Sequence, residues 1–217
     1  MRRLGITRRR LIVAVLVATI CSVGAGYAAS LGLGSNQLHA WSQTLTKGTC
    51  NQTSTTADDT YVQQALPTST AGGTATTLTI SPVAGAQDYA FIRFNLSGCS
   101  LPTTAGADSA VLTVRVTTAG SDTISLFPVT SSWSSSTLTW NGVPGLTIGS
   151  TATGTFSAST TGAKTVTVTA DVDAAIKAGA LWGWELRATS GTAIVAIGAA
   201  ENGTSGNRPS MTLSYEK

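Results

Sequence analysis

Short segments in which apolar and polar residues alternate recur along most of this chain, and they constrain its fold more than any other feature. Residues 89–96, 112–116 and 124–128 each place apolar side chains at every second position. Alternation with a period of two is typical of a half-buried β-strand, whereas an amphipathic helix needs apolar residues three and four positions apart. The sequence therefore predicts a mainly β protein.

The other segments fit the same fold class. Further strands are expected at 60–64, 76–80, 166–168, 182–189, 193–197 and 210–215, with Gly, Ser, Asn and Pro between them. One short helix is expected over Asp171–Ala178, with Asp171 near its N-cap and Gly179 as its stop. Many short strands separated by turns predict an all-β sandwich with one short helix, in a single domain.

The first 28 residues have the organisation of an export signal. Five arginines lie within the first ten residues, an apolar run extends from Leu11 to Tyr27, and small residues occur at 26 and 28. We expect residues 1–28 to be a signal peptide or, if uncleaved, an N-terminal apolar anchor helix. The arginines would stay in the cytoplasm, so the rest of the chain is expected to be secreted or on the extracellular face of the cell envelope. Residues 29–56 would form an irregular or partly extended connecting segment before a domain at 57–217.

The positive charge of the chain belongs to this leader. The net charge of the whole chain is +3, but beyond residue 28 the chain has eight basic and ten acidic residues. A nucleic-acid-binding surface needs clustered basic residues, so nucleic acid is not an expected partner. A membrane would be contacted only through the N-terminal apolar segment, and the oligomeric state is left open.

Two cysteines remain in the exported part, Cys50 and Cys99, while Cys21 lies within the apolar run. An even pair in an oxidising compartment predicts a disulfide. It would tie the connecting segment to the loop after the strand at 89–96. Metal binding is the alternative, but two isolated cysteines without a neighbouring histidine supply few ligands.

One stretch carries a family resemblance. The string VTSSWSSSTLTWNGVPG at 129–145 resembles the central signature of the DNRLRE-domain family of secreted bacterial β-sandwich modules, with serine at 135 where the family often has glutamate. The matching residues are Trp133, Thr139, Trp140, Asn141 and Pro144; further matches are DTYV (59–62), FIRFNLSGCSLP (91–102), AVLTVRV (110–116), DVDAAIKAGALWGWELRA (171–188) and ENGTSGNRPSMTLSY (201–215). The resemblance covers residues 57–216 and implies a jelly-roll arrangement similar to carbohydrate-binding modules. Trp133 and Trp140 are expected to fill the core or a corner between strands.

Residues that could perform catalysis are scarce. The single histidine, His39, lies in the connecting segment, which removes the usual general base and a Ser-His-Asp triad. Glycoside hydrolysis needs only two carboxylates, but no motif selects a pair among the ten acidic residues. We therefore expect a protein that is not an enzyme.

Two acidic pairs could hold a metal ion. Asp58 with Asp59, and Asp171 with Asp173, offer the hard oxygen ligands that calcium prefers. Such aspartates more commonly serve turns and helix caps. The expectation is no cofactor, with a structural calcium near Asp58 or Asp59 as the alternative.

Sugar binding has a mechanism that this chain could supply. Trp182 and Trp184, separated by Gly183, are expected on the same face of one strand, where flat indoles could stack on pyranose rings. The same spacing also suits a core strand, because large aromatic residues are mostly buried. The sequence thus favours a non-catalytic module that contacts a glycan or another cell-envelope polymer. The alternatives are a structural surface protein that assembles through sheet edges and, further behind, a carboxylate-based carbohydrate-active enzyme.

Overall fold

The computed structural model describes residues 47–53, 55–102 and 105–216. The chain divides into two compact units, Met1–Gln43 and Thr44–Lys217, and all described residues belong to the second. The predicted leader at 1–28 and His39 lie outside the described residues. None of the helices in the described part has the length and apolarity that a membrane crossing requires.

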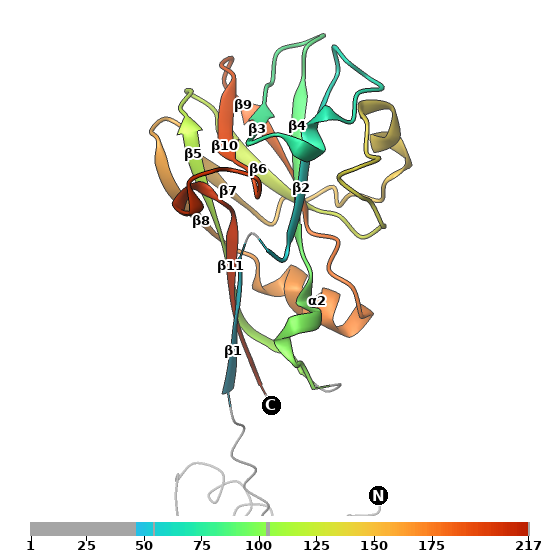
Figure 1. The fold of residues 1–217 in the computed structure, drawn as a ribbon, viewed down its shortest axis with the longest axis vertical. Helices are drawn as coiled ribbons and strands as arrows, with labels where there is room; N and C mark the ends of the chain where they lie inside the picture. The colour runs from blue at the N-terminus through green and yellow to red at the C-terminus, as the bar shows by residue number, and fades with distance from the viewer. Residues whose placement is uncertain (1–46, 54, 103–104, 217) are drawn as a thin grey trace, which may run out of the picture. The chain divides into compact units, whose positions relative to one another are not determined.

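In the described part of the chain, eleven strands form two antiparallel sheets, which confirms the predicted β-sandwich (Figure 1). The first sheet has the order β1 (Lys47–Gln52), β11 (Ser210–Glu216), β5 (Ala107–Thr118), β10 (Val195–Gly198) and β3 (Thr77–Ile80). The strand β8 (Gly162–Thr167) also belongs to this sheet and pairs with β5. The second sheet has the order β2 (Ala57–Gln63), β4 (Asp88–Phe94), β9 (Trp184–Ser190), β6 (Thr123–Pro128) and β7 (Gly154–Ser157).

The main core lies between the two sheets. In β4 the predicted alternation holds, because Ala90, Ile92 and Phe94 are buried against the first sheet. Leu112, Val114 and Val116 of β5 face them from the other sheet, as the sequence pattern predicts. Burial of these apolar side chains provides the main driving force for packing the sheets together.

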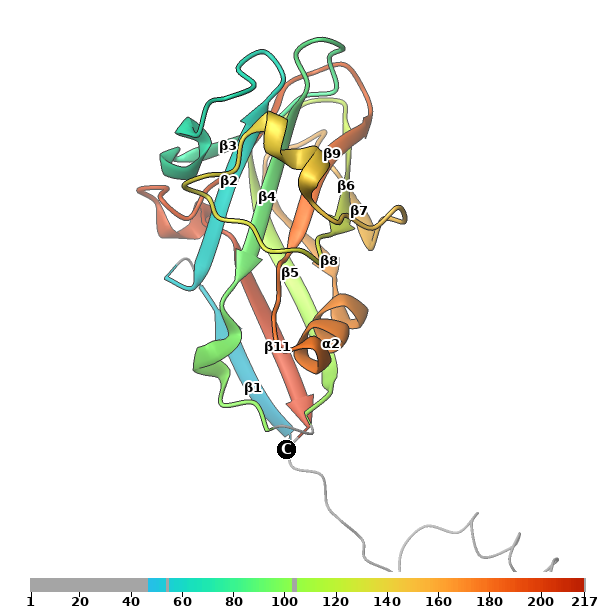
Figure 2. The same cartoon turned by 90° about the vertical axis from the view of Figure 1, so that its right-hand side faces the viewer.

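A second apolar cluster covers the outer face of the second sheet. It contains Val62, Phe91, Val129, Trp133 and Leu138. Figure 2 shows the segment between β6 and β7, which includes the 3₁₀ helix η3 (Trp140–Gly145), crossing in front of β4 and β9. The expectation that Trp133 fills a corner is confirmed, since it is 7% exposed. The Trp140 ring packs on Tyr89, with 4.8 Å between ring centroids.

The strand β1 lies within the connecting segment, which we expected to be irregular or partly extended. Residues 47–52 pair antiparallel with β11, Cys50 opposite Leu213, and so form an edge strand of the first sheet. The predicted disulfide is confirmed: Cys50 bonds Cys99, with 5.4 Å between the Cα atoms. Cys99 belongs to the 3₁₀ helix η2 (Leu96–Cys99), which directly follows β4.

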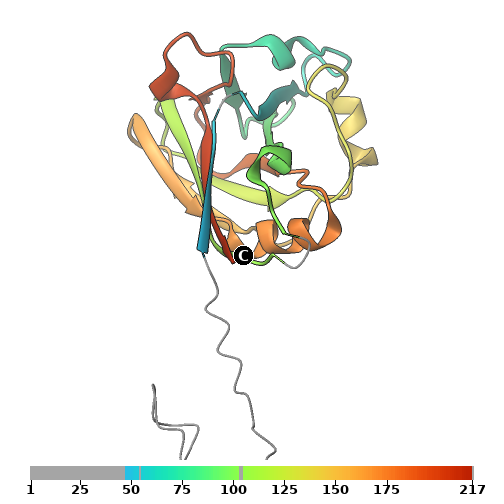
Figure 3. The same cartoon turned by 60° about the horizontal axis from the view of Figure 1, so that its bottom comes forward.

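The helix α2 (Thr169–Ala178) begins two residues before the predicted start. Its N-cap is Val168, and Asp171 lies near it, in the first turn of the helix, as predicted. Gly179 ends the helix as predicted, because its left-handed backbone (φ 79°) lets the terminal N–H groups reach the last carbonyls. Figure 3 shows α2 and η2 toward the same end of the sandwich. Two other 3₁₀ helices, η1 (Ala71–Thr74) and η4 (Ser205–Asn207), lie in loops.

Candidate functional site

Trp182 and Trp184 do not share a face, contrary to the alternation expected of them. Trp184 is completely buried in the main core, and its Nε1 donates a hydrogen bond to Asp171 Oδ2 at 2.6 Å. Trp182 precedes β9 and packs against the outer cluster. Gly183 between them has a φ of +73°, which breaks the extended conformation. A Cβ there would lie 1.9 Å from the carbonyl oxygen of Ile92, so only glycine fits.

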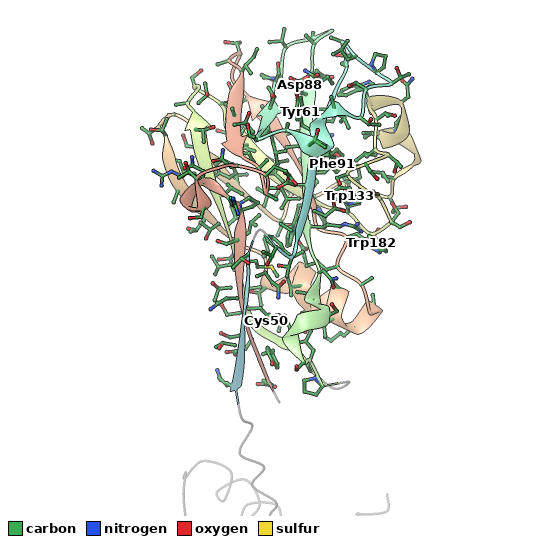
Figure 4. The ribbon with its side chains drawn as sticks, viewed as in Figure 1. Cys50, Tyr61, Asp88, Phe91, Trp133 and Trp182 are labelled. Atoms are coloured by element: carbon green, nitrogen blue, oxygen red, sulfur yellow. A yellow bond between two sulfur atoms is a disulfide. The ribbon has the colours of Figure 1, made fainter. Side chains whose placement is uncertain are left out.

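Trp182 belongs to a stack of three side chains on the outer face of the second sheet. The guanidinium of Arg93 lies 5.1 Å from the ring centroid of Trp133 and 5.1 Å from that of Trp182. Trp133 Nε1 also donates to the carbonyl oxygen of Trp182 at 2.7 Å, which fixes the segment before β9. Figure 4 shows Trp133 and Trp182 together beside β4. Both indoles therefore lie within cation–π distance of the guanidinium.

Asp58 completes this group of polar and aromatic side chains. It lies opposite Arg93 in the register of β2 and β4, and its Oδ2 accepts hydrogen bonds from Nε at 2.9 Å and Nη2 at 2.5 Å. The two side chains keep 28% and 24% of their surface exposed. Because both side chains are partly exposed, a ligand can reach them. Sequence analysis missed Arg93 as a site residue, although the alternation of β4 does place it on the outer face.

Asp58, Arg93 and Trp182 line a groove of about 910 Å³. Its walls are the ends of β2 and β4, the η2 segment and the turn that follows α2. Besides Asp58, Arg93 and Trp182, polar side chains line it at Thr55, Thr56, Asn95, Ser97 and Ser100. Apolar side chains line it at Leu96, Leu101, Ile176 and Leu181. A partly apolar groove with many hydroxyl and amide groups suits an amphipathic, uncharged or weakly charged ligand.

The disulfide fixes one wall of the groove. Gln52 Nε2 donates to the sulfur atoms of Cys50 and Cys99 at 2.9 and 2.8 Å. Tyr215 Oη donates to the carbonyl oxygen of Cys99 at 2.8 Å. The η2 segment is thereby attached to both β1 and β11, so a ligand would meet a wall that is already in place.

Asp58 and Asp59, the two aspartates expected near a metal, point to opposite faces of β2. Asp58 pairs with Arg93 on the outer face, whereas Asp59 is 1% exposed on the inner side and its Oδ2 accepts from the backbone N–H of Ala200 at 2.8 Å. Burial raises the pKa of Asp59 to about 8, and the nearby carboxyl of Glu201 contributes. In the described ranges, no three His, Cys, Asp or Glu side chains converge as a metal site.

Comparison with known families identifies the class of protein to which this sandwich belongs. A model of a family of carbohydrate-binding modules matches residues 51–215, nearly all of the described fold. The chain belongs to carbohydrate-binding module family 96. The expected likeness to carbohydrate-binding modules is confirmed at this level, while the resemblance to the DNRLRE family stays a prediction. A comparison with curated proteins found no match.

Proposed function

We propose that this chain is a non-catalytic glycan-binding module of the cell exterior, and that its glycan lies in the groove beside Trp182. Membership of a carbohydrate-binding family supports the ligand class. The observation that carries the location is the stack of Trp133, Arg93 and Trp182, which places a partly exposed indole at the groove with the Asp58 carboxylate adjacent.

Binding would combine stacking with directed hydrogen bonds. The C–H face of a pyranose ring packs against the exposed part of the Trp182 indole, since both surfaces are flat and apolar. The sugar hydroxyls, which donate and accept hydrogen bonds, then reach Asp58 Oδ1 and Arg93 Nη1. Because Asp58 and Arg93 are already held in place by each other, little side-chain entropy is lost when a sugar binds.

The groove residues also support a role without catalysis. Hydrolysis of a glycosidic bond ordinarily uses two carboxyl groups about 5–10 Å apart. Among the described residues that line the groove, Asp58 supplies the only carboxylate, and Arg93 keeps it paired. Asp58 alone cannot act both as an acid and as a base or nucleophile at opposite sides of the same bond.

The proposed location is outside the cytoplasm, at the cell envelope or in the medium. A disulfide that joins an edge strand to the groove wall is the kind of crosslink that persists in an oxidising compartment. The N-terminal sequence expected to direct export supports the same location. Its ligand there would be a cell-envelope or extracellular polysaccharide.

Replacing Trp182 by alanine is expected to weaken retention on polysaccharide by about 2 kcal/mol, roughly thirtyfold in affinity, because a central tryptophan commonly provides this much binding energy. The measurement is saturable binding of the full chain to a panel of insoluble neutral and acidic polysaccharides. Trp140→Ala is the matched control, since Trp140 packs on Tyr89 and does not line the groove.

Unchanged retention by Trp182→Ala, with thermal unfolding showing an intact fold, would place the glycan elsewhere. If no polysaccharide of the panel were retained and the protein formed ordered multimers, assembly through sheet edges would replace glycan binding as the proposed function. Turnover of any polysaccharide in the panel would instead support the alternative that this protein is a carboxylate-based carbohydrate-active enzyme.

A further inference from the structure

The charges that line the groove cancel each other. Among the described residues of its lining, Asp58 and Arg93 are the only charged ones, and two hydrogen bonds of 2.9 and 2.5 Å join them. Lys177 of α2 does not line the groove, and its ammonium group pairs with Asp173 at 2.6 Å. The carboxylate of an acidic sugar would therefore have to compete with Asp58 for its cationic partner.

The C-terminal end of α2 adds negative potential to one wall of the groove. Ala175 and Ile176 of its last turn line the groove together with Gly179 and Ala180, which follow the helix. The backbone dipoles of a helix give its C-terminal end a partial negative charge. An anionic ligand would thus meet this helix end as well as the Asp58 carboxylate, so the groove favours an uncharged glycan.

Four half-buried aliphatic side chains extend the main core to the surface of the groove: Leu96, Leu101, Ile176 and Leu181. The elements η2 and α2, which carry two of them, lie toward the same end of the sandwich (Figure 3). A sugar hydroxyl gains nothing against such a surface, because it gives up hydrogen bonds to water. A methyl group is stabilised there by the same transfer out of water that drives core packing.

We infer that the groove selects an uncharged glycan whose amino sugars carry N-acetyl groups, an inference that rests on the proposed function. The methyl of an acetamido group packs on the aliphatic side chains. Its N–H needs an acceptor and its carbonyl needs a donor. Asp58 offers a carboxylate, and Ser97 and Ser100 offer exposed hydroxyls on another part of the lining. A glucan without acetyl groups would leave the aliphatic part of the groove unused.

Two β-1,4-linked tetrasaccharides test this inference, since N-acetylchitotetraose and cellotetraose differ only in the substituent at C2 of each ring. Isothermal titration calorimetry with the full chain measures both affinities. The N-acetylated tetramer is expected to bind at least about fivefold more tightly, because burial of one methyl group contributes about this factor. A β-1,4-linked tetramer of uronic acid is expected to bind more weakly than either.

The substitution Ile176→Thr tests the aliphatic surface. It keeps the branched shape at Cβ but replaces the apolar end of the side chain, so the preference for the N-acetylated tetramer over cellotetraose should fall at least about twofold. Ile194→Thr is the matched control, because Ile194 is 57% exposed and does not line the groove, and it should keep the full preference. Thermal unfolding shows whether each variant is folded.

The substitution Asp58→Asn tests the charge balance. It removes the carboxylate that pairs with Arg93 and so leaves the guanidinium free to bind an anion. Affinity for the uronic acid tetramer should then rise by up to about fivefold at low salt, the range of a partly exposed ion pair. The gain should disappear as salt is added, because exposed charges are screened. An unchanged affinity for the acidic tetramer would contradict the role given to Asp58.

The outcomes separate this inference from the glycan groove itself. Equal affinities for the two neutral tetramers, or tightest binding of the acidic one, would overturn the N-acetyl preference. If that binding were nevertheless lost in Trp182→Ala, the groove would remain the glycan site. Binding of none of the three tetramers, or binding that Trp182→Ala leaves unchanged, would overturn both the preference and the location in the groove.

Discussion

Replacing Trp184 by alanine should lower the free energy of unfolding by about 4 kcal/mol and the midpoint of thermal unfolding by about 8–16 °C. The indole is fully buried between the two sheets, so its removal leaves a cavity that the rigid strands cannot close. The variant also loses the hydrogen bond from Nε1 to Asp171, which connects β9 to α2. Chemical denaturation of the full chain measures the change.

Two variants serve as controls for this prediction. Trp184→Phe keeps most of the apolar volume and should cost about 1–3 kcal/mol, the sum of one lost hydrogen bond and a smaller cavity. Trp182→Ala should cost less than Trp184→Ala, because Trp182 is only partly buried on the outer face. Equal losses for Trp182→Ala and Trp184→Ala would contradict the placement of the two indoles on opposite faces of the sheet.

Local alternation was sufficient to predict most of the sandwich. In β4 and β5 every second side chain is apolar over several residues, so the inward face could be identified without knowing the partner strand. The end of α2 could also be predicted from the sequence, because glycine after an amphipathic segment is a strong stop signal. The cysteine pair predicted the disulfide for a reason of chemistry, since only two cysteines remain beyond the leader.

The pairing of strands far apart in the sequence could not be predicted in the same way. The strand β1 is polar at most positions and gains its structure from β11, more than 150 residues later in the chain. Its sequence, KGTCNQ, has no alternating apolar pattern that could distinguish an edge strand from a loop. The short strand β7 (Gly154–Ser157) was missed for a similar reason, since four residues are too few for a periodic pattern.

The candidate site depends on two features that a linear pattern does not encode. Gly183 adopts a left-handed backbone, which turns Trp182 away from the face occupied by Trp184. The groove itself is formed by loops and by the ends of separate elements, so its lining residues come together only through the fold. Arg93 could be assigned to the outer face from alternation, but its cation–π contacts with two indoles depend on the path of the segment that crosses that face.

Removing the disulfide with the double substitution Cys50→Ser and Cys99→Ser should lower the free energy of unfolding by about 4 kcal/mol. The bridge closes a loop with a sequence separation of 49, and in the chain-entropy model the freed loop adds this much entropy to the unfolded state. For a domain of this size the midpoint of thermal unfolding should fall by about 8–16 °C. A scan with and without reductant measures it: reductant should destabilise the wild-type chain and leave the double variant unchanged.

The same variant should also weaken glycan retention, at a temperature where it remains folded, because η2 forms a wall of the groove and Cys99 lies in that segment. The bond from Tyr215 Oη to the Cys99 carbonyl persists without the disulfide, so the wall is expected to loosen and not to detach. We expect the affinity to fall about tenfold, which corresponds to about 1.4 kcal/mol. The reason is that glycan binding must then also order the loosened η2 wall. Full retention by the folded double variant would show that the ligand does not contact the η2 wall, and an unfolding midpoint insensitive to reductant would contradict the bridge itself.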